Sequence, residues 1–128
     1  MTTRGVRGAT TIESDTKDVV LVATKEMLET ILRSNSGLKR ADIASAYFTV
    51  TDDIVSAYPA LAARQMGWDE VPMMCACEIP VEGSLPLCIR VLIHWNTDKP
   101  QSEIKHVYLR DAVKLRPDLI NKPKEKPQ

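Results

Sequence analysis

The sequence has no excess of charge of either sign and no long apolar segment. Its 17 Lys and Arg residues balance 17 Asp and Glu residues, so net charge attracts the protein neither to nucleic acid nor to an anionic membrane. A membrane-spanning helix needs about 20 predominantly apolar residues, and the longest apolar run here is interrupted by Arg90. We therefore expect no nucleic-acid partner and no membrane partner.

Cysteine is scarce, and its count is odd. The 3 cysteines do not form a complete disulfide framework and are typical of a protein in a reducing compartment. The N-terminal residues, MTTRGVRGATT, lack the hydrophobic stretch of a signal peptide. Together these features predict a cytoplasmic protein.

The usual motifs of cofactor and metal sites are also missing. Neither Gly-x-Gly-x-x-Gly nor a Walker loop occurs in the sequence, so we expect no nucleotide cofactor. Cys75, Cys77, Cys88 and His94 can be combined into a metal site, but Cys75 and Cys77 lack the Cys-x₂-Cys spacing of a zinc turn. Because cysteines in apolar strands are usually small core residues, we expect no metal.

The length and the apolar patterns predict one domain. A chain of 128 residues can bury a single core. Apolar periodicity predicts strands at about 3–12, 41–51, 72–78, 88–95 and 105–115, and helices at about 15–34 and 58–64. This order is typical of an α+β fold with one mixed β-sheet and helices packed on one face. Residues 1–120 are expected to form the domain, and residues 121–128, which include no apolar residue, a disordered tail.

The stretch from Pro72 to Trp95 carries the two charged residues that fit least well in an apolar sheet. It predicts a hairpin whose strands are joined by a turn at Glu82–Ser84, where Gly83 adopts a positive φ. Glu78 lies near the end of the first strand, and Arg90 lies in the middle of the second. An ionised side chain in an apolar strand is costly unless it is paired or lines a wet pocket. A structural ion pair and a polar functional site both agree with this pattern.

Further arginines lie in or beside apolar segments. Arg7 is in the first strand, Arg64 is near the end of the second helix, and Arg116 follows the last strand. Arg7 also fits plain surface charge, and Arg64 fits a favourable cation at a helix C-terminus. Taken with Arg90, a tyrosine and one carboxylate, the guanidinium groups suit a small ligand that bears more than one carboxylate. Glu78 has no partner for general acid–base catalysis.

Six ordered motifs resemble one enzyme family. They are Arg4–Thr11, Pro59–Arg64, Cys75–Glu78, Cys88–Arg90, His106–Leu109 and Leu115–Asp118. They are similar to the short, monofunctional bacterial chorismate mutases of the trimeric α/β class, and the resemblance runs from about Thr3 to Leu119. It implies a homotrimer shaped as a pseudo α/β barrel, with active sites between adjacent subunits. It also implies the conversion of chorismate to prephenate in aromatic amino-acid biosynthesis, by a Claisen rearrangement without a cofactor.

The resemblance also implies roles for single residues. Arg90 and Glu78 correspond to the catalytic residues: Arg90 lies beside the ether oxygen, and Glu78 accepts a hydrogen bond from the substrate hydroxyl. The substrate-binding positions are the carboxylate-binding Arg7 and Tyr108, the cation Arg64 lent by the neighbouring subunit, Cys75 as an assistant to Glu78, the apolar wall residues Tyr58, Ala60 and Leu115, and Arg116 in a segment that orders over the ligand.

Two features depart from the family pattern. A related sequence has a lysine where this chain has Leu61, so one cation at the mouth of the pocket is missing. Cys75 and Glu78 differ by three positions and should face opposite sides of a flat strand. A bulge or twist has to re-aim one of them, or Cys75 contributes through its backbone.

Two other functions fit the same residues. One is a trimeric protein that binds small carboxylates without catalysis, because a similar fold does not fix function. The other is a chorismate sensor without catalytic activity, which Leu61 favours. The joint presence of Glu78, Arg90, Tyr108 and Arg7 favours the enzyme, because a binding protein needs only one arginine.

Overall fold

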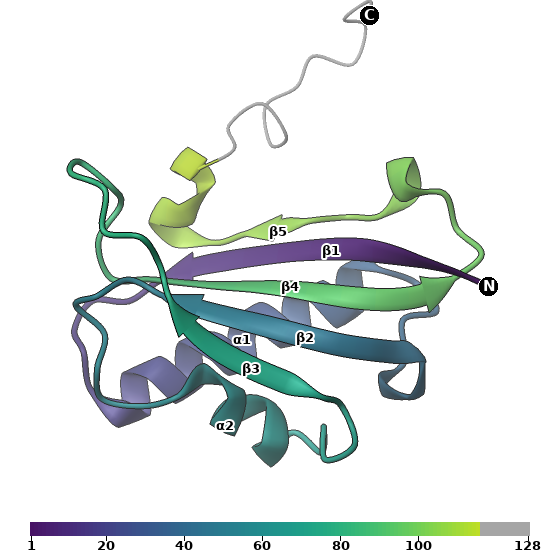
Figure 1. Ribbon diagram of the computed structural model, residues 1–128, viewed down its shortest axis with the longest axis horizontal. Coiled ribbons are helices and arrows are strands. Elements are labelled where there is room, and N and C mark those ends of the chain that lie inside the picture. The colour runs from purple at the N-terminus through teal and green to yellow at the C-terminus, as the bar shows by residue number, and fades with distance from the viewer. Residues whose placement is uncertain (116–128) are drawn as a thin grey trace, which may run out of the picture.

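A five-stranded mixed sheet organises the chain, whose residues 1–115 are described by a computed structural model. The strands are β1 (Thr2–Thr11), β2 (Ile43–Val50), β3 (Met73–Cys77), β4 (Cys88–Thr97) and β5 (Val107–Tyr108), and the α-helices are α1 (Lys17–Ser34) and α2 (Pro59–Gln65). Short 3₁₀ turns span Arg40–Asp42, Gln101–Glu103 and Arg110–Leu115. The strand order is β3-β2-β4-β1-β5 (Figure 1).

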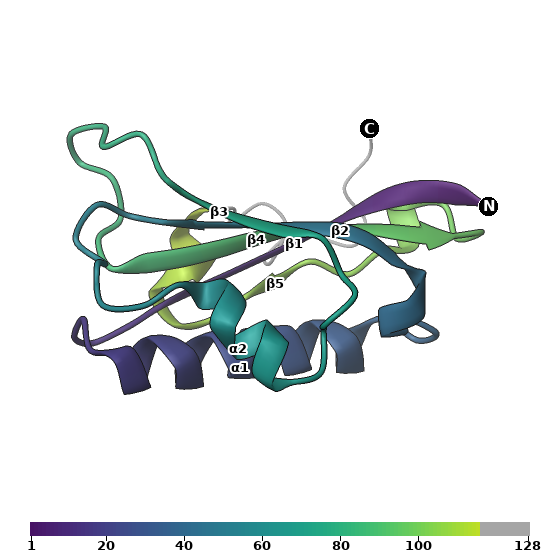
Figure 2. The same cartoon turned by 60° about the horizontal axis from the view of Figure 1, so that its bottom comes forward.

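Both α-helices pack on the same side of the sheet, as Figure 2 shows. Helix α1 begins where the side chain of Thr16 accepts a hydrogen bond from the backbone N–H of Val19 at 3.3 Å, which satisfies one of the free donors of the first turn. Pro59 begins α2, where its missing N–H costs nothing. These observations confirm the expected α+β fold, in which one face of the sheet carries no α-helix within residues 1–115.

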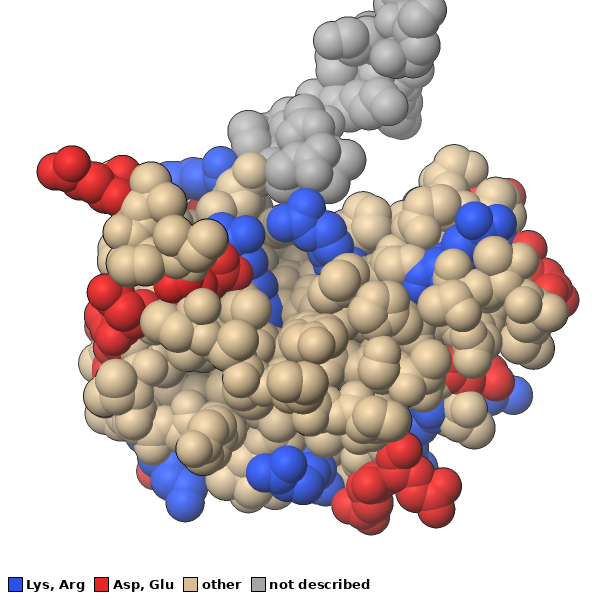
Figure 3. All heavy atoms as spheres, in the orientation of Figure 1, with Lys and Arg blue, Asp and Glu red and all other residues tan. Residues whose placement is uncertain are grey.

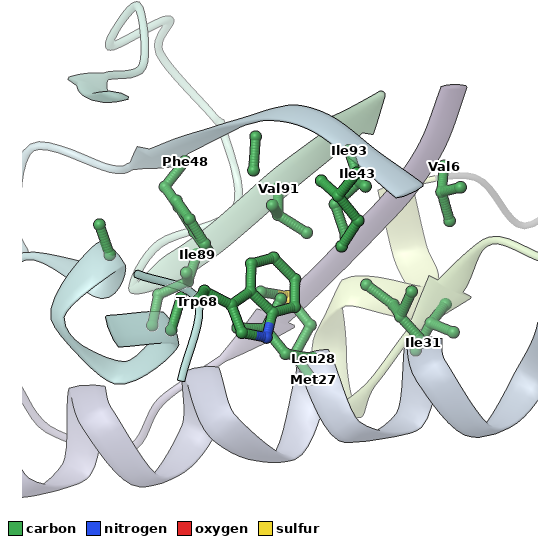
Figure 4. Close-up of a cluster of buried hydrophobic side chains, with 14 of the residues drawn as sticks. Val6, Met27, Leu28, Ile31, Ile43, Phe48, Trp68, Ile89, Val91 and Ile93 are labelled. Atoms are coloured by element: carbon green, nitrogen blue, oxygen red, sulfur yellow. The ribbon is translucent and has the colours of Figure 1, made fainter. Parts of the chain in front are cut away.

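The core lies between the sheet and the helices (Figure 4). Alternate residues of β1, β2 and β4 meet the apolar stripe of α1, and Trp68, which follows α2, lies in the middle of the cluster near Met27 and Leu28. The labelled members are Val6, Met27, Leu28, Ile31, Ile43, Phe48, Trp68, Ile89, Val91 and Ile93. Burial of each such side chain stabilises the fold by about 1.5–3 kcal/mol. The helix-covered face therefore makes the sheet a rigid support for whatever its other face carries.

The expected hairpin between residues 72 and 95 is wrong. Strand β2 lies between β3 and β4, and β3 pairs with β2 in parallel. Gly83 does adopt a positive φ of 85°, but the turn there belongs to a long loop. Pro80 and Pro86 lie in that loop, and proline has no N–H to donate to a ladder.

The expected last strand is also wrong beyond Tyr108. Residues 107–108 pair in parallel with β1, and the chain then enters the 3₁₀ turn Arg110–Leu115. Arg110 has a positive φ of 54°, which no strand residue adopts. The change of direction lets Ala112, which is fully buried, pack against Ala9 and Tyr108. Arg110 therefore does not continue the strand face that Tyr108 occupies.

The close approach of α1 to the sheet requires glycine at position 8. A Cβ atom there lies 2.6 Å from Cδ1 of Ile31 and 3.1 Å from Cγ1 of Val91, both in the core. We expect Gly8→Ala to lower the free energy of unfolding by about 1–3 kcal/mol, because overpacking displaces the helix or forces side chains off their rotamers. Chemical denaturation measures this loss.

Gly5→Ala is the matched control in the same strand. A Cβ atom at Gly5 has Cδ1 of Leu92 as its nearest neighbour at 3.6 Å, an ordinary contact. Its effect should stay within about 0.5 kcal/mol, as at other tolerant positions. Equal losses for the two variants are inconsistent with tight packing of α1 at Gly8.

Candidate active site

One row of residues crosses the face of the sheet that the helices leave free, here called the open face. The row consists of Ala76 in β3, Thr49 in β2, Arg90 in β4, Ala9 in β1 and Tyr108 in β5, each paired with the next. Paired residues point to the same side of a sheet, and neighbouring strands lie about 4.8 Å apart. Arg90 and Tyr108 are therefore separated by a single small residue, a distance of about 10 Å between backbones.

Glu78 is fixed beside this row by three contacts. Its backbone N–H donates to the carbonyl oxygen of Val50 at 2.8 Å, which continues the pairing of β3 with β2 past Cys77. The hydroxyl of Thr49 donates to Oε2 of Glu78 at 2.5 Å. Nε of Arg90 lies 3.5 Å from the same oxygen. Within residues 1–115 both side-chain contacts of Glu78 thus involve Oε2, which leaves Oε1 as an acceptor.

Arg90 and Tyr108 each bury a polar atom that has no hydrogen-bond partner in the described part of the chain. These atoms are Nε of Arg90 and the hydroxyl of Tyr108. Nε of Arg90 lies close enough to Glu78 to form an ion pair, but the geometry of this contact is not that of a hydrogen bond. A buried polar atom without a partner costs about 1–3 kcal/mol, and both of these atoms are donors that an acceptor oxygen satisfies.

The surroundings of Tyr108 are apolar and neutral. Leu115 packs against a small cluster that contains Ala9, Cys88, Tyr108 and Ala112. Burial raises the pKa of the Cys88 thiol, and the opposing effect of the Arg90 charge is smaller. Cys88 therefore stays protonated and lines the site as an apolar side chain.

Arg7 projects from the same face, two residues before Ala9 in β1. Its backbone N–H donates to Nδ1 of His106 at 3.0 Å, which ties β1 to the start of β5. Figure 3 looks onto the open face and shows Lys and Arg side chains beside a hollow, with acidic side chains next to it. Most of the remaining face is uncharged (Figure 3).

A second group of predicted residues lies elsewhere, at the edge of the sheet. Tyr58, Ala60, Arg64 and Cys75 line a pocket of about 260 Å³ between α2 and β3. Glu78 and Arg90 line a different pocket of about 210 Å³. A single chain therefore divides the predicted site in two: Arg7, Glu78, Arg90, Tyr108 and Leu115 on the open face, and Tyr58, Ala60, Arg64 and Cys75 at the edge. Arg116 is outside the described residues.

Cys75 and Glu78 face opposite sides of the sheet. Cys75 pairs with Phe48, which is buried under the helices. Glu78 contacts Thr49, the next residue of β2, on the open face. The register of β2 and β3 runs without a bulge from residue 46 to residue 50, so nothing re-aims the side chain of Cys75 toward Glu78 of the same chain.

The loop before Tyr58 is held by one carboxylate. Asp15 accepts hydrogen bonds from the backbone N–H groups of Val55 at 2.9 Å and Ser56 at 3.2 Å, and from the Ser56 hydroxyl at 2.6 Å. The bond from the Ser56 hydroxyl is the largest contribution that lowers the pKa of Asp15, followed by the bond from Val55. The carboxylate therefore stays ionised near neutral pH and fixes the segment that presents Tyr58.

Sequence reasoning missed Thr49, which it identified only as a residue suited to a strand. Its position gave one usable signal, because Thr49 and Tyr47 alternate with buried Ala46 and Phe48 and so share the open face. The contact with Glu78 could not be predicted, because it depends on β3 pairing with β2.

Within residues 1–115 no group of three or more His, Cys, Asp or Glu residues is placed to hold a metal ion. No helix in that range is long and apolar enough to cross a membrane.

The fold and the site together define the class of protein. It is an α+β protein whose open sheet face holds a fixed carboxylate, a guanidinium group and a tyrosine hydroxyl, a set suited to a small anionic ligand with a hydroxyl group.

Comparison with known proteins places the chain in one family. Residues 3–119 match the chorismate mutase type I family. Chorismate mutase AroH of Thermus thermophilus is 53% identical over 116 residues, which cover 91% of this chain and 95% of that protein. Chorismate mutase AroH of Bacillus subtilis is 45% identical over 120 residues, which cover 93% of this chain and 94% of that protein.

A solved structure agrees with this result. A chorismate mutase from Clostridium thermocellum matches with a TM-score of 0.82 and 49% identity, covering 84% of this chain and 96% of that chain. The chain therefore belongs to the chorismate mutase type I family. It is an isomerase of aromatic amino-acid biosynthesis, with chorismate as substrate and prephenate as product. The alternative of a binding or sensing protein without activity is not favoured.

Proposed function

We propose that Arg90 and Glu78 are the catalytic residues of this chorismate mutase and that Arg7 and Tyr108 bind the carboxylates of the substrate. The observation that carries the proposal is the row on the open face, where Glu78 is fixed by Thr49 while one polar atom each of Arg90 and Tyr108 is buried without a hydrogen-bond partner within residues 1–115. Such a set is incomplete without a ligand that supplies acceptors to Arg90 and Tyr108 and a donor to Glu78.

The rearrangement makes two physical demands on the site. One C–O bond breaks while one C–C bond forms within the same molecule, and no proton is transferred. The enzyme holds the dicarboxylate in the compact conformation that reacts. It also stabilises the negative charge that grows on the ether oxygen as the C–O bond lengthens.

Arg90 meets the second demand. Its guanidinium group projects from β4, a central strand with neighbours on both sides, so it is oriented before the reaction and does not have to reorganise. Glu78 accepts a hydrogen bond from the substrate hydroxyl through Oε1, the oxygen that Thr49 and Arg90 leave free. Because this bond is made in both the ground state and the transition state, it mainly holds the substrate in place.

We propose that the complete site forms between subunits of a homotrimer. Tyr58, Ala60, Arg64 and Cys75 lie at the sheet edge, apart from Glu78 and Arg90 of the same chain. The open face and the edge also expose large apolar side chains, with exposed fractions of 44% for Tyr47, 59% for Met74 and 38% for Leu92. Apolar surface of this kind marks an interaction site, and a neighbouring chain that covers it brings its edge group to the row.

The remaining proposals concern the ends of the site and the place of the protein. Residues 1–115 belong to one domain, and the enzyme acts in the cytoplasm without a cofactor. Leu115 packs against the cluster that contains Tyr108, which supports its place in the substrate site, whereas Arg116 and the predicted tail are outside the described residues.

The pH dependence of the reaction tests the proposed function. We expect kcat to change little across the neutral range, because no step transfers a proton. Chorismate consumption followed by ultraviolet absorbance from pH 4 to pH 9, in H₂O and in D₂O, measures this. A bell-shaped profile centred near neutrality with a large solvent isotope effect is the contrary result, because it indicates general acid–base catalysis.

A further inference from the structure

We infer that Thr49 is a positioning residue for the rearrangement, and that its hydroxyl sets which oxygen of Glu78 faces the substrate and limits the ion pair of Glu78 with Arg90 to the single contact at 3.5 Å. The inference rests on the proposed roles of Glu78 and Arg90. It adds a residue that makes no proposed contact with the substrate and acts through its neighbour.

The geometry places Thr49 between the two charged residues. In the sheet it is directly opposite Arg90 on one side and Ala76 on the other, and Glu78 follows two residues after Ala76. Its hydroxyl donates to Oε2 of Glu78 at 2.5 Å, a shorter distance than the 3.5 Å from that oxygen to Nε of Arg90. The hydrogen bond with Thr49 is therefore the closer of the two contacts that orient the carboxylate.

Partial burial of Glu78 and Arg90 strengthens the effect of the Thr49 hydrogen bond on the orientation of the Glu78 carboxylate. The side chains of Arg90 and Glu78 are 34% and 28% exposed, so about two thirds of each is shielded from water and their contacts are stronger than those of a fully exposed pair. Without the hydroxyl of Thr49, the nearest donor is the guanidinium group of Arg90, and arginine and carboxylate groups prefer a two-pronged pairing. That pairing turns Oε1 away from the substrate hydroxyl and directs the Arg90 charge toward Glu78, away from the ether oxygen.

Loss of the Thr49 hydroxyl affects both proposed catalytic residues, and the two effects change different kinetic parameters. Reorientation of Glu78 weakens substrate binding and raises KM, while diversion of Arg90 lowers kcat. We expect Thr49→Val to lower kcat/KM by about ten- to a hundredfold, as expected when a hydrogen bond to a charged group is lost. Thr49→Val keeps the β-branched shape that suits a strand, and thermal melting verifies that the fold is intact.

Thr49→Ser is the matched control, because it keeps the hydroxyl and removes only a methyl group. We expect it to retain activity within a fewfold of the wild type. If Thr49→Ser and Thr49→Val lose activity equally, packing of the methyl group is what matters and the inference is overturned. If Thr49→Val fails to fold, Thr49→Ala takes its place, because it removes the hydroxyl without placing a methyl group beside the Glu78 carboxylate, and Thr49→Ser then controls for the hydroxyl.

A double-mutant cycle with Glu78→Gln separates positioning from general structural support. If Thr49 acts through Glu78, Thr49→Val should have almost no further effect on kcat/KM in the Glu78→Gln background. Losses that add in the double variant overturn the inference while leaving the role of Glu78 intact. A Glu78→Gln variant with wild-type kinetics overturns the proposed function itself, and the two failures are therefore distinguishable.

Discussion

Replacement of Arg90 by alanine should lower kcat by about a hundred- to a thousandfold. In chorismate the ether oxygen is a weak, neutral acceptor, whereas in the transition state it carries partial negative charge. Removal of one preorganised donor from such a site costs about 3–4 kcal/mol of transition-state stabilisation. Steady-state kinetics with chorismate measure the loss, and a bicyclic transition-state analogue should lose affinity in parallel.

Arg64→Ala provides the contrast to Arg90→Ala. Arg64 is exposed near the end of α2, and the carboxylate that it is proposed to bind changes little in charge during the reaction. We therefore expect its loss to raise KM, by about tenfold or more, and to change kcat little. A large decrease in kcat for Arg64→Ala and none for Arg90→Ala is the opposite pattern, and it would refute the assignment of the two roles.

Mixing of two defective variants should restore activity if the site is shared between subunits. In a trimer formed from equal amounts of Arg90→Ala and Arg64→Ala chains, each site has a chance of about one half of receiving an intact Arg90. It has the same chance of receiving an intact Arg64 from the neighbour, so about a quarter of the sites are complete. We expect kcat/KM of the co-refolded mixture to reach about a quarter of the wild-type value, measured at low chorismate concentration.

The control mixture combines Arg90→Ala with Glu78→Gln. Both residues lie on the open face of one chain and line one pocket, so no combination of these subunits produces a complete site. This mixture should show no recovery. If the Arg64 mixture also fails to recover although mixed trimers form, each site draws its residues from one chain, and the proposed assembly is wrong.

Much of the fold could be predicted because its signals are local. The apolar spacing of α1, its Thr16 cap and the alternation in β1, β2 and β4 depend only on neighbours in sequence. The errors arose where the pairing partner lies far away in sequence. The turn at Gly83 fits a hairpin locally, but β2 provides a better partner for both flanking strands.

Site residues, too, were predicted where the signal is local and missed where it depends on distant segments. Glu78 and Arg90 were predicted because charges in apolar strands need an explanation in any sequence. Thr49 was not predicted as a site residue, because threonine is common in strands and its partner lies 29 residues away. The question whether Cys75 and Glu78 share a face was correctly raised by their odd spacing, and the unbroken register of β2 and β3 places them on opposite faces.

The most direct test of the central claim, that the Arg90 charge stabilises the transition state, replaces Arg90 by citrulline through chemical synthesis. Citrulline keeps the length and planar end of arginine and three of its five N–H donors, but it is neutral and carries a carbonyl oxygen in place of one NH₂ group. The measured quantity is kcat for chorismate, with the melting temperature as a check on folding. We predict a decrease of about a hundredfold or more. A kcat equal to that of the wild type contradicts the account, because shape alone would then drive the reaction.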